Sequence, residues 1–134
     1  MATIQLELVT PEAKLLSQAV GMVVLPGVEG DMGVLADHAP TVSTLRPGVV
    51  AIHTDMGSAP MQRVFVGGGV AEISGERCIV LAEEAIDLAN LDKEAATARA
   101  TEAAAALGAA RSEGEKSQAE SELAIARAQV EALT

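Results

Sequence analysis

The chain has 134 residues, with 9 lysines and arginines against 19 aspartates and glutamates, so its formal net charge is −10. This acidic balance argues against nucleic acid or anionic lipid as a direct partner, and with no Trp or Tyr and a single Phe there is no platform for base stacking. The length suits one domain, or one small domain with an appendage, and the lone Cys78 allows neither an intramolecular disulfide nor a cysteine-based zinc site.

Short runs with strand character fill the first part of the chain. "IQLELV" at 4–9 alternates apolar and polar residues, which predicts a strand with Ile4, Leu6 and Leu8 on one face. Many short strands with no helical pattern between them predict a β-sandwich or barrel. Further runs rich in Val and Ile, which pack well on a pleated surface, are "AVGMVVL" at 19–25, "VVAIH" at 49–53, "RVFV" at 63–66, "GVAEI" at 69–73 and "RCIVLA" at 77–82.

Clusters of turn residues separate these runs. The "SGE" at 74–76 predicts a tight hairpin joining residues 69–73 to 77–81. The glycines at 67–69 are expected to permit positive φ or a close approach of the backbone. The remaining predicted turns are "PGVEGD" at 26–31, "RPG" at 46–48, "TDMGSAP" at 54–60 and "GGG" at 67–69.

The composition changes near residue 87, where alanine replaces glycine and β-branched residues. Strong helix formers dominate "NLDKEAATARATEAAAALGAA" at 90–110. Asn90 or Asp92 can cap this helix, and Gly108 stands where its C-terminal stop is expected. We therefore predict a β-sandwich domain at 1–87, followed by a helical domain at 88–134.

A second helix is predicted for residues 112–133, where Ser112 and Glu115 have capping-box spacing. The short linker predicts that the two helices fold back as an antiparallel hairpin. Alanine faces bury little apolar area, and each Å² of buried apolar area contributes only about 25 cal/mol of favourable free energy. We therefore expect the hairpin to depend on the sandwich or a partner and to be able to move. The predicted apolar faces are Ala95, Ala98, Ala103 and Ala106 on the first helix and Ala119, Leu123, Ala126 and Val130 on the second.

The opening residues, "MATIQLELVT", lack the basic start of a signal peptide. No apolar stretch reaches the length of about 18 residues that a helix needs to span a bilayer. The sequence thus predicts a soluble protein that reaches a membrane only through partners.

Catalytic and metal chemistry find little support in the sequence. His38 has no second catalytic group beside it, because His53, the only other histidine, lies in a separate run. A lone histidine in a loop is typical of a hydrogen-bonding or interface residue, and Asp31, Asp37 and His38 follow no known metal-ligand spacing. Neither glycine cluster is followed by the Lys-Ser or Lys-Thr of a phosphate loop. We expect no catalytic residue, no metal and no cofactor.

One stretch carries a specific family resemblance. "VLPGVEGDMGVLADHAPTVSTLRPG" at 24–48 closely resembles the signature region of the epsilon subunit of F-type ATP synthases, with the family pattern matched from Pro26 to Gly48. "VGGGVAEI" at 66–73 and "VLAEEA" at 80–85 match two further family segments. The order of a strand-rich domain and a helical hairpin matches the family over the whole chain.

This resemblance implies a non-catalytic part of the rotating central stalk of a proton-translocating synthase. It implies docking to the gamma subunit and to the c-subunit ring, at the cytoplasmic face of the bacterial inner membrane as a peripheral subunit. The Pro- and Gly-rich segment would be a rigid rim with Glu29, Asp31 and His38 as its polar groups. The acidic residue matching Asp31 lies at the ring contact in the family. In many members the extended hairpin reaches the alpha/beta catalytic head and blocks ATP hydrolysis.

ATP binding is a separate property of some family members, through a motif at the start of the first helix. The matching positions here are Leu91, Asp92, Ala95 and Ala96, so alanine replaces the motif's arginine and a phosphate-binding cation is missing. Glu83 and Asp92 remain only as weak remnants of such a site.

Two other classes of function differ from this one in what they require of the sequence. An enzyme acting on small metabolites would need convergent polar residues, which the sequence does not assemble. A free-standing adaptor or interaction protein with the same two parts is the alternative, and such a protein would be monomeric in a lysate, whereas a stalk subunit would co-purify with large membrane-bound partners.

Overall fold

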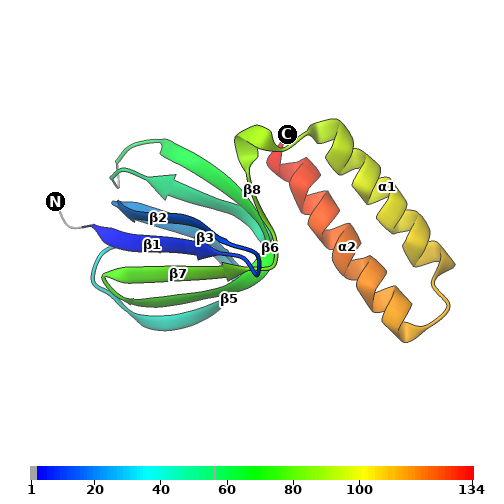
Figure 1. Cartoon of the computed structure of the whole chain (residues 1–134), viewed down its shortest axis with the longest axis horizontal. Helices are drawn as coiled ribbons and strands as arrows, with labels where there is room; N and C mark the ends of the chain where they lie inside the picture. The colour runs from blue at the N-terminus through cyan, green and yellow to red at the C-terminus, as the bar shows by residue number, and fades with distance from the viewer. Residues whose placement is uncertain (1–2, 56) are drawn as a thin grey trace.

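A computed structural model describes residues 3–55 and 57–134 (Figure 1). Residues 1 and 2 of the predicted first domain, and Met56 of the predicted turn at 54–60, lie outside the described residues. Eight strands precede two helices, which confirms the predicted fold class of a β-sandwich with a C-terminal helical hairpin. The strands are β1 (Ile4–Val9), β2 (Lys14–Val20), β3 (Met22–Gly27), β4 (Gly30–Val34), β5 (His38–His53), β6 (Pro60–Gly75), β7 (Arg77–Ala82) and β8 (Ala85–Asp87).

The strands form one mixed sheet that bends into two layers. Its order is β2-β1-β7-β6-β5-β3-β4, with β8 also paired to β6. The β1–β7 pair is parallel and the others are antiparallel. Because β5 and β6 have 16 residues each, both run through the two layers. β6 pairs with β8 at residues 64–66 and with β7 at residues 69–74.

The glycines at 67–69 form the bend of β6 between these two partners, so the predicted turn at this place is wrong. Gly68 and Gly69 have φ values of 93° and 148°, which confirms the expected positive φ. A Cβ on Gly69 would lie 2.1 Å from the Leu81 carbonyl oxygen. The chain continues as a strand because both neighbours of the bend remain paired.

The space between the layers holds the main hydrophobic core. Ile4, Leu6 and Leu8 are all buried there, as the alternation in β1 predicts. The core also contains the single cysteine, Cys78, which is fully buried. Each layer thus buries its inner face against the other layer. The side chains on the outer faces are left for contacts with the helices or with other molecules.

Two predictions about the first half need correction. The run at 19–25 is not one strand, because Gly21 turns the chain from β2, which pairs with β1, to β3, which pairs with β5. A Cβ there would lie 2.1 Å from the Thr54 carbonyl oxygen. The Pro- and Gly-rich segment is largely strand, since β4 and the first half of β5 belong to it, and the predicted turn at 46–48 lies inside β5. The predicted hairpin at 74–76 is confirmed, with Ser74 opposite Arg77.

A short 3-10 helix, η1 (Leu88–Asn90), leads into α1 (Lys93–Ala109) and α2 (Glu113–Ala132). Of the two candidate caps, Asp92 caps α1 by accepting a hydrogen bond from the Ala95 amide at 3.2 Å. Ser112 accepts a hydrogen bond from the Glu115 amide at 3.1 Å, as its spacing predicts. Gly108 lies within the last turn of α1 and does not follow it, because the helix continues to Ala109.

The helices lie antiparallel, with α2 between α1 and the sandwich (Figure 1). Ala119, Leu123 and Ala126 of α2 are buried and Val130 is half-buried, in agreement with the predicted face. The predicted face of α1 is wrong in part. Ala103 is buried as predicted. The other buried residue of α1 is Ala96, about two turns earlier on the same side, whereas Ala95, Ala98 and Ala106 are exposed.

Candidate functional site

The β3–β4 hairpin carries two of the predicted site residues. Glu29 lies in its turn and Asp31 at the start of β4, opposite Pro26. Both side chains are exposed, as is the neighbouring Val28. We call Val28, Glu29 and Asp31 the hairpin tip.

Arg46 of β5 holds the base of this tip. Its Nη2 donates to Asp31 Oδ1 at 2.6 Å, and its Nη1 donates to the Gly27 carbonyl oxygen at 2.6 Å. No local sequence pattern predicts this contact, because 15 positions separate Arg46 from Asp31. The consequence is a fixed orientation for the Asp31 carboxylate.

His38 lies elsewhere. It begins β5 and pairs with Gly75, and its Nδ1 lies 2.7 Å from the Ala39 carbonyl oxygen. Eight residue steps along the strand separate His38 from Arg46, which is about 26 Å at 3.3 Å a residue. The structure therefore brings Glu29 and Asp31 together and leaves His38 at the far end of β5.

The outward side of the layer formed by β1, β7 and halves of β5 and β6 carries apolar side chains among polar ones. The register aligns Thr44, Val70, Leu81 and Val9 in one row, and Val42, Glu72, Ile79 and Glu7 in the next. Val42 is 71% exposed and Leu81 is 45% exposed. The side chains that we call the outer apolar face are Val9, Val42, Val70, Ile79 and Leu81.

This face is free of the helical hairpin, because α2 contacts the opposite layer through β5 and β6 (Figure 1). Shallow clefts of about 460 and 470 Å³ hollow it. The first is lined by Val9, Val70 and Leu81, and the second by Val42 and Ile79. Exposed apolar side chains that are rimmed by polar ones are typical of a contact surface.

The remnants of the nucleotide motif have different surroundings. Asp92 serves as the cap of α1, and Glu83 is exposed in the connection between β7 and β8. Ala95, at the position of the motif's arginine, is exposed on α1. The carboxylates therefore have no arginine beside them at that position.

The strongest charged cluster was not predicted. Arg99 of α1 donates to Glu84 of the β7–β8 connection, with Nη1 at 3.0 Å from Oε1 and Nη2 at 3.3 Å from Oε2. Its Nε donates to Glu122 of α2. The hydrogen bonds that Arg99 donates to Glu122 and Glu84 raise the pKa of Arg99, and the bond that Glu122 accepts lowers the pKa of Glu122. Both partners lie at least 15 residues away in sequence.

Within residues 3–55 and 57–134, no group of three or more His, Cys, Asp and Glu side chains could hold a metal ion. None of the helices described is both long and apolar enough to cross a membrane. The candidate contact surfaces among the described residues are the hairpin tip, the outer apolar face and the helical hairpin.

Comparison with known proteins gives one family. Residues 3–88 match the model of the ATP synthase delta/epsilon chain β-sandwich domain. The ATP synthase epsilon chain of Rhodospirillum rubrum is 48% identical over 126 residues, which cover 94% of this chain and 92% of that one. That of Paramagnetospirillum magneticum is also 48% identical, over 97% of this chain and 96% of its own. A sodium ion specific epsilon chain from Propionigenium modestum is 47% identical over 96 residues, 72% of this chain and 68% of its own.

Solved structures agree in shape. A chain of the Euglena gracilis mitochondrial ATP synthase, solved as an OSCP/F1/c-ring assembly, has a TM-score of 0.83 at 28% identity and covers all of this chain and 83% of its own. A chain from the Tetrahymena thermophila mitochondrial synthase has a TM-score of 0.66 at 14% identity, over 98% of this chain and 96% of its own, which shows the fold alone. The chain therefore belongs to the family of ATP synthase epsilon chains, which are structural and not catalytic subunits.

Proposed function

We propose that this chain couples rotation of the c ring, through the gamma subunit, to ATP synthesis in the catalytic head of a proton-translocating F-type synthase. The observation that carries the proposal is that the sandwich has two separate exposed surfaces. The hairpin tip lies at one place, and the outer apolar face lies on the other layer. A subunit that joins two moving partners needs two such surfaces on one rigid body.

The hairpin tip is the proposed contact with the c ring. Glu29 and Asp31 supply exposed carboxylates for polar loops of the ring. Arg46 fixes the Asp31 side chain before any partner arrives, and a preorganised group loses less conformational entropy on docking. Val28, which precedes Glu29 and is 58% exposed, adds an apolar contact to the tip.

The outer apolar face is the proposed contact with gamma. Val42 and Leu81 are the most exposed of its large apolar side chains, and their burial against a partner helix would contribute favourable free energy. His38 begins β5 in the same layer, so we assign it to the rim of the gamma surface and not to the ring surface. This assignment divides the three predicted residues between two partners.

The wider context follows from the relatives. The Euglena neighbour comes from an assembly with F1 and a c ring, and the Tetrahymena neighbour from a central stalk with a c ring. By the same arrangement this chain would be a peripheral subunit at the cytoplasmic face of the bacterial inner membrane, held there by gamma and the ring. Its hairpin, when extended, would reach the alpha/beta head and regulate hydrolysis weakly.

Affinity capture of the tagged chain from solubilised membranes tests the proposal. We expect gamma, the c ring and the catalytic head to co-purify. The Val42→Lys, Leu81→Lys double variant should lose gamma, whereas Asp31→Lys should weaken only the ring contact. A chain recovered alone and monomeric would contradict the stalk function and favour a free-standing adaptor.

A further inference from the structure

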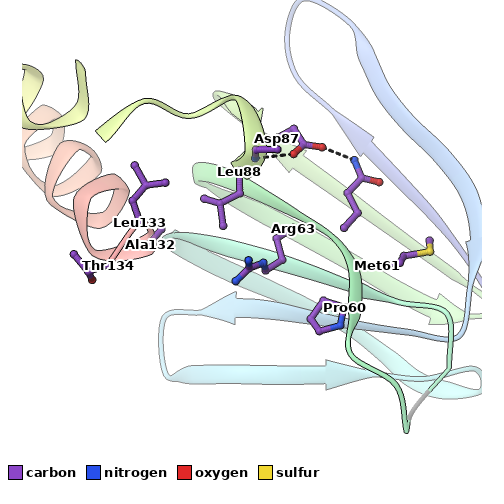
Figure 2. A pocket seen from close by; sticks show the side chains of 10 residues that line it. Pro60, Met61, Arg63, Asp87, Leu88, Ala132, Leu133 and Thr134 are labelled. Atoms are coloured by element: carbon purple, nitrogen blue, oxygen red, sulfur yellow. Dashed lines mark hydrogen bonds between the residues drawn. The ribbon is translucent and has the colours of Figure 1, made fainter. Parts of the chain in front are cut away.

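The contact between the helical hairpin and the sandwich is narrow. A cleft of about 630 Å³ opens on one side of the C-terminal end of α2. Its lining includes Met61, Arg63 and Leu88 on one wall and Leu133 on the other (Figure 2). A second cleft of about 290 Å³, lined by Val49 among others, borders the same end of α2. Solvent therefore reaches α2 from both sides of its contact.

The apolar part of this contact is small. Val64 and Val66 belong to the main core, so Phe65 between them points to the opposite face of β6, where it is fully buried. The helices bury mainly alanine, with Leu123 as the one large apolar side chain among the buried positions described for them. Few large apolar side chains of the helices are thus fully buried, so a polar contact can add to what holds the hairpin.

Arg99 provides that polar contact. Within the part of the chain that the structure describes, its pair with Glu84 is the one ion pair between the hairpin and the sandwich. The Arg99 side chain is 27% exposed, against 40% for Glu84 and 45% for Glu122. The guanidinium is thus the most shielded member of the cluster, and its two-atom pairing with Glu84 fixes its direction.

The two partners of Arg99 differ in what they join. Glu122 lies on α2, so its pair with Arg99 stays intact when the hairpin moves as a unit. Glu84 belongs to the sandwich side, so its pair must break. Detachment therefore depends on Glu84 directly, and on Glu122 only through its hold on the Arg99 guanidinium.

Gly67 sets the position of Glu84. A Cβ on Gly67 would lie 2.6 Å from Glu84 Cγ and 3.1 Å from Oε1, and the Gly67 amide donates to the Glu84 carbonyl oxygen at 2.9 Å. Gly67 is not among the glycines with positive φ. Gly67 has no side chain, which leaves room for the side chain of Glu84. Gly68 and Gly69, by contrast, supply the positive φ values of the bend.

We propose that Glu84 and Arg99 form a latch that keeps the hairpin on the sandwich, and that Gly67 is a positioning residue for Glu84. The latch is a property of the isolated chain. Its consequence in the synthase rests on the proposed function: the latch would determine how often the hairpin is free to reach the catalytic head, without any bound nucleotide.

Spin labels on the isolated full-length chain test the latch. Cysteines replacing Glu12 and Arg111, both exposed, place one label on the sandwich and one at the hairpin turn, while the native Cys78 is buried. Pulsed electron–electron distance measurements then give the detached population. We expect Glu84→Gln to raise it about threefold to tenfold, the range for a partly shielded charged pair, and Glu122→Gln to raise it less.

Matched controls separate the latch from general damage. Glu83→Gln makes the same change one residue away on an exposed side chain and should leave the distances unchanged. Gly67→Ala should act like Glu84→Gln, whereas Gly33→Ala, where a Cβ meets nothing within 4 Å, should act like the parent. Melting of the sandwich should be the same in all of them, since the main core is untouched.

The triple charge inversion Glu84→Arg, Arg99→Glu and Glu122→Arg keeps both pairs of the cluster with opposite signs, so it should restore the closed population. Equal distance distributions for Glu84→Gln and Glu83→Gln would overturn the latch, and a failure of the inversion to close would do the same. A closed Gly67→Ala variant beside an open Glu84→Gln variant would overturn the role of Gly67. These outcomes do not depend on stalk assembly, so they are distinct from a failed affinity capture.

Discussion

Arg46 and Asp31 are joined at 2.6 Å although β3 lies between their strands in the sheet. The pair crosses the base of the hairpin tip, and the same arginine binds the Gly27 carbonyl oxygen. Both side chains are well exposed, so the pair contributes little to the free energy of unfolding. Its effect is to orient the carboxylate that we assign to the c ring.

Charge reversal of Asp31, alone or together with Glu29, should weaken attachment to the c ring and leave the isolated protein folded. The reason is that the lysines would face the same partner with the opposite charge, while the core is untouched. Co-purification of the ring and proton-coupled ATP synthesis by membranes are the measurements. The swap Asp31→Arg with Arg46→Asp is the control, because it restores the internal pair but not the charge at position 31. Normal synthesis by the Glu29→Lys, Asp31→Lys variant would count against the assignment.

Valine at Gly68 or Gly69 should destabilise the sandwich by about 1–3 kcal/mol, because both residues have positive φ. The larger loss is expected for Gly69, where the new Cβ also meets the Leu81 carbonyl oxygen at 2.1 Å. Thermal or urea unfolding measures the change. Gly33→Ala is the comparison, since that site has space and no positive φ. An unchanged melting temperature for Gly69→Val would refute the explanation.

Cys78 should resist thiol reagents in the native protein. Burial raises the pKa of its thiol from 9.0 to about 11, and only the thiolate reacts. Because the folded-state pKa is the raised one, the contribution to stability is complete below pH 9.0 and is lost as the pH rises toward 11. Alkylation followed by mass spectrometry at pH 8, with and without denaturant, measures this. Rapid labelling of the folded chain would show that the core around β7 opens readily.

Removal of residues 92–134 should raise ATP hydrolysis by membranes only slightly. From residue 88 onward the chain has basic residues at 93, 99, 111, 116 and 127 against acidic residues at 92, 94, 102, 113, 115, 120, 122 and 131. Arg99, moreover, is already paired within the chain. The family resemblance implies an acidic contact surface on the head, which would repel a hairpin with an excess of acidic residues. A rise of about tenfold, equal to about 1.4 kcal/mol of inhibitory coupling, would show that the hairpin is a strong inhibitor.

Local patterns predicted the parts of the fold that depend on neighbours in sequence. The alternation in β1, the hairpin at 74–76 and the caps Asp92 and Ser112 are of this kind. The prediction of α1's buried face was wrong in part because alanines are spread around the helix, which gives little contrast between its faces. Strand β4 was missed because it is short and carries two glycines in "GDMGV".

The candidate surfaces were harder to predict, because they depend on pairing between distant strands. The family resemblance pointed to Asp31 but not to Arg46, which reaches it only after β3, β4 and β5 have assembled. The contacts of Arg99 were equally hard to predict from sequence, since one partner follows β7 and the other lies on the second helix. The outer apolar face requires the registers of four strands before its residues become neighbours.

The continuity of β5 and β6 through both layers has a mechanical consequence. In a sandwich of two separate sheets, shear between the layers is resisted only by packed side chains. Here it is also resisted by two unbroken backbones, since β5 and β6 remain hydrogen-bonded to each other from one layer to the other (Figure 1). A twisting load that enters at the hairpin tip and leaves at the outer apolar face would therefore pass along covalent chain, and the glycine bend at 67–69 would be the place where the sandwich is most compliant.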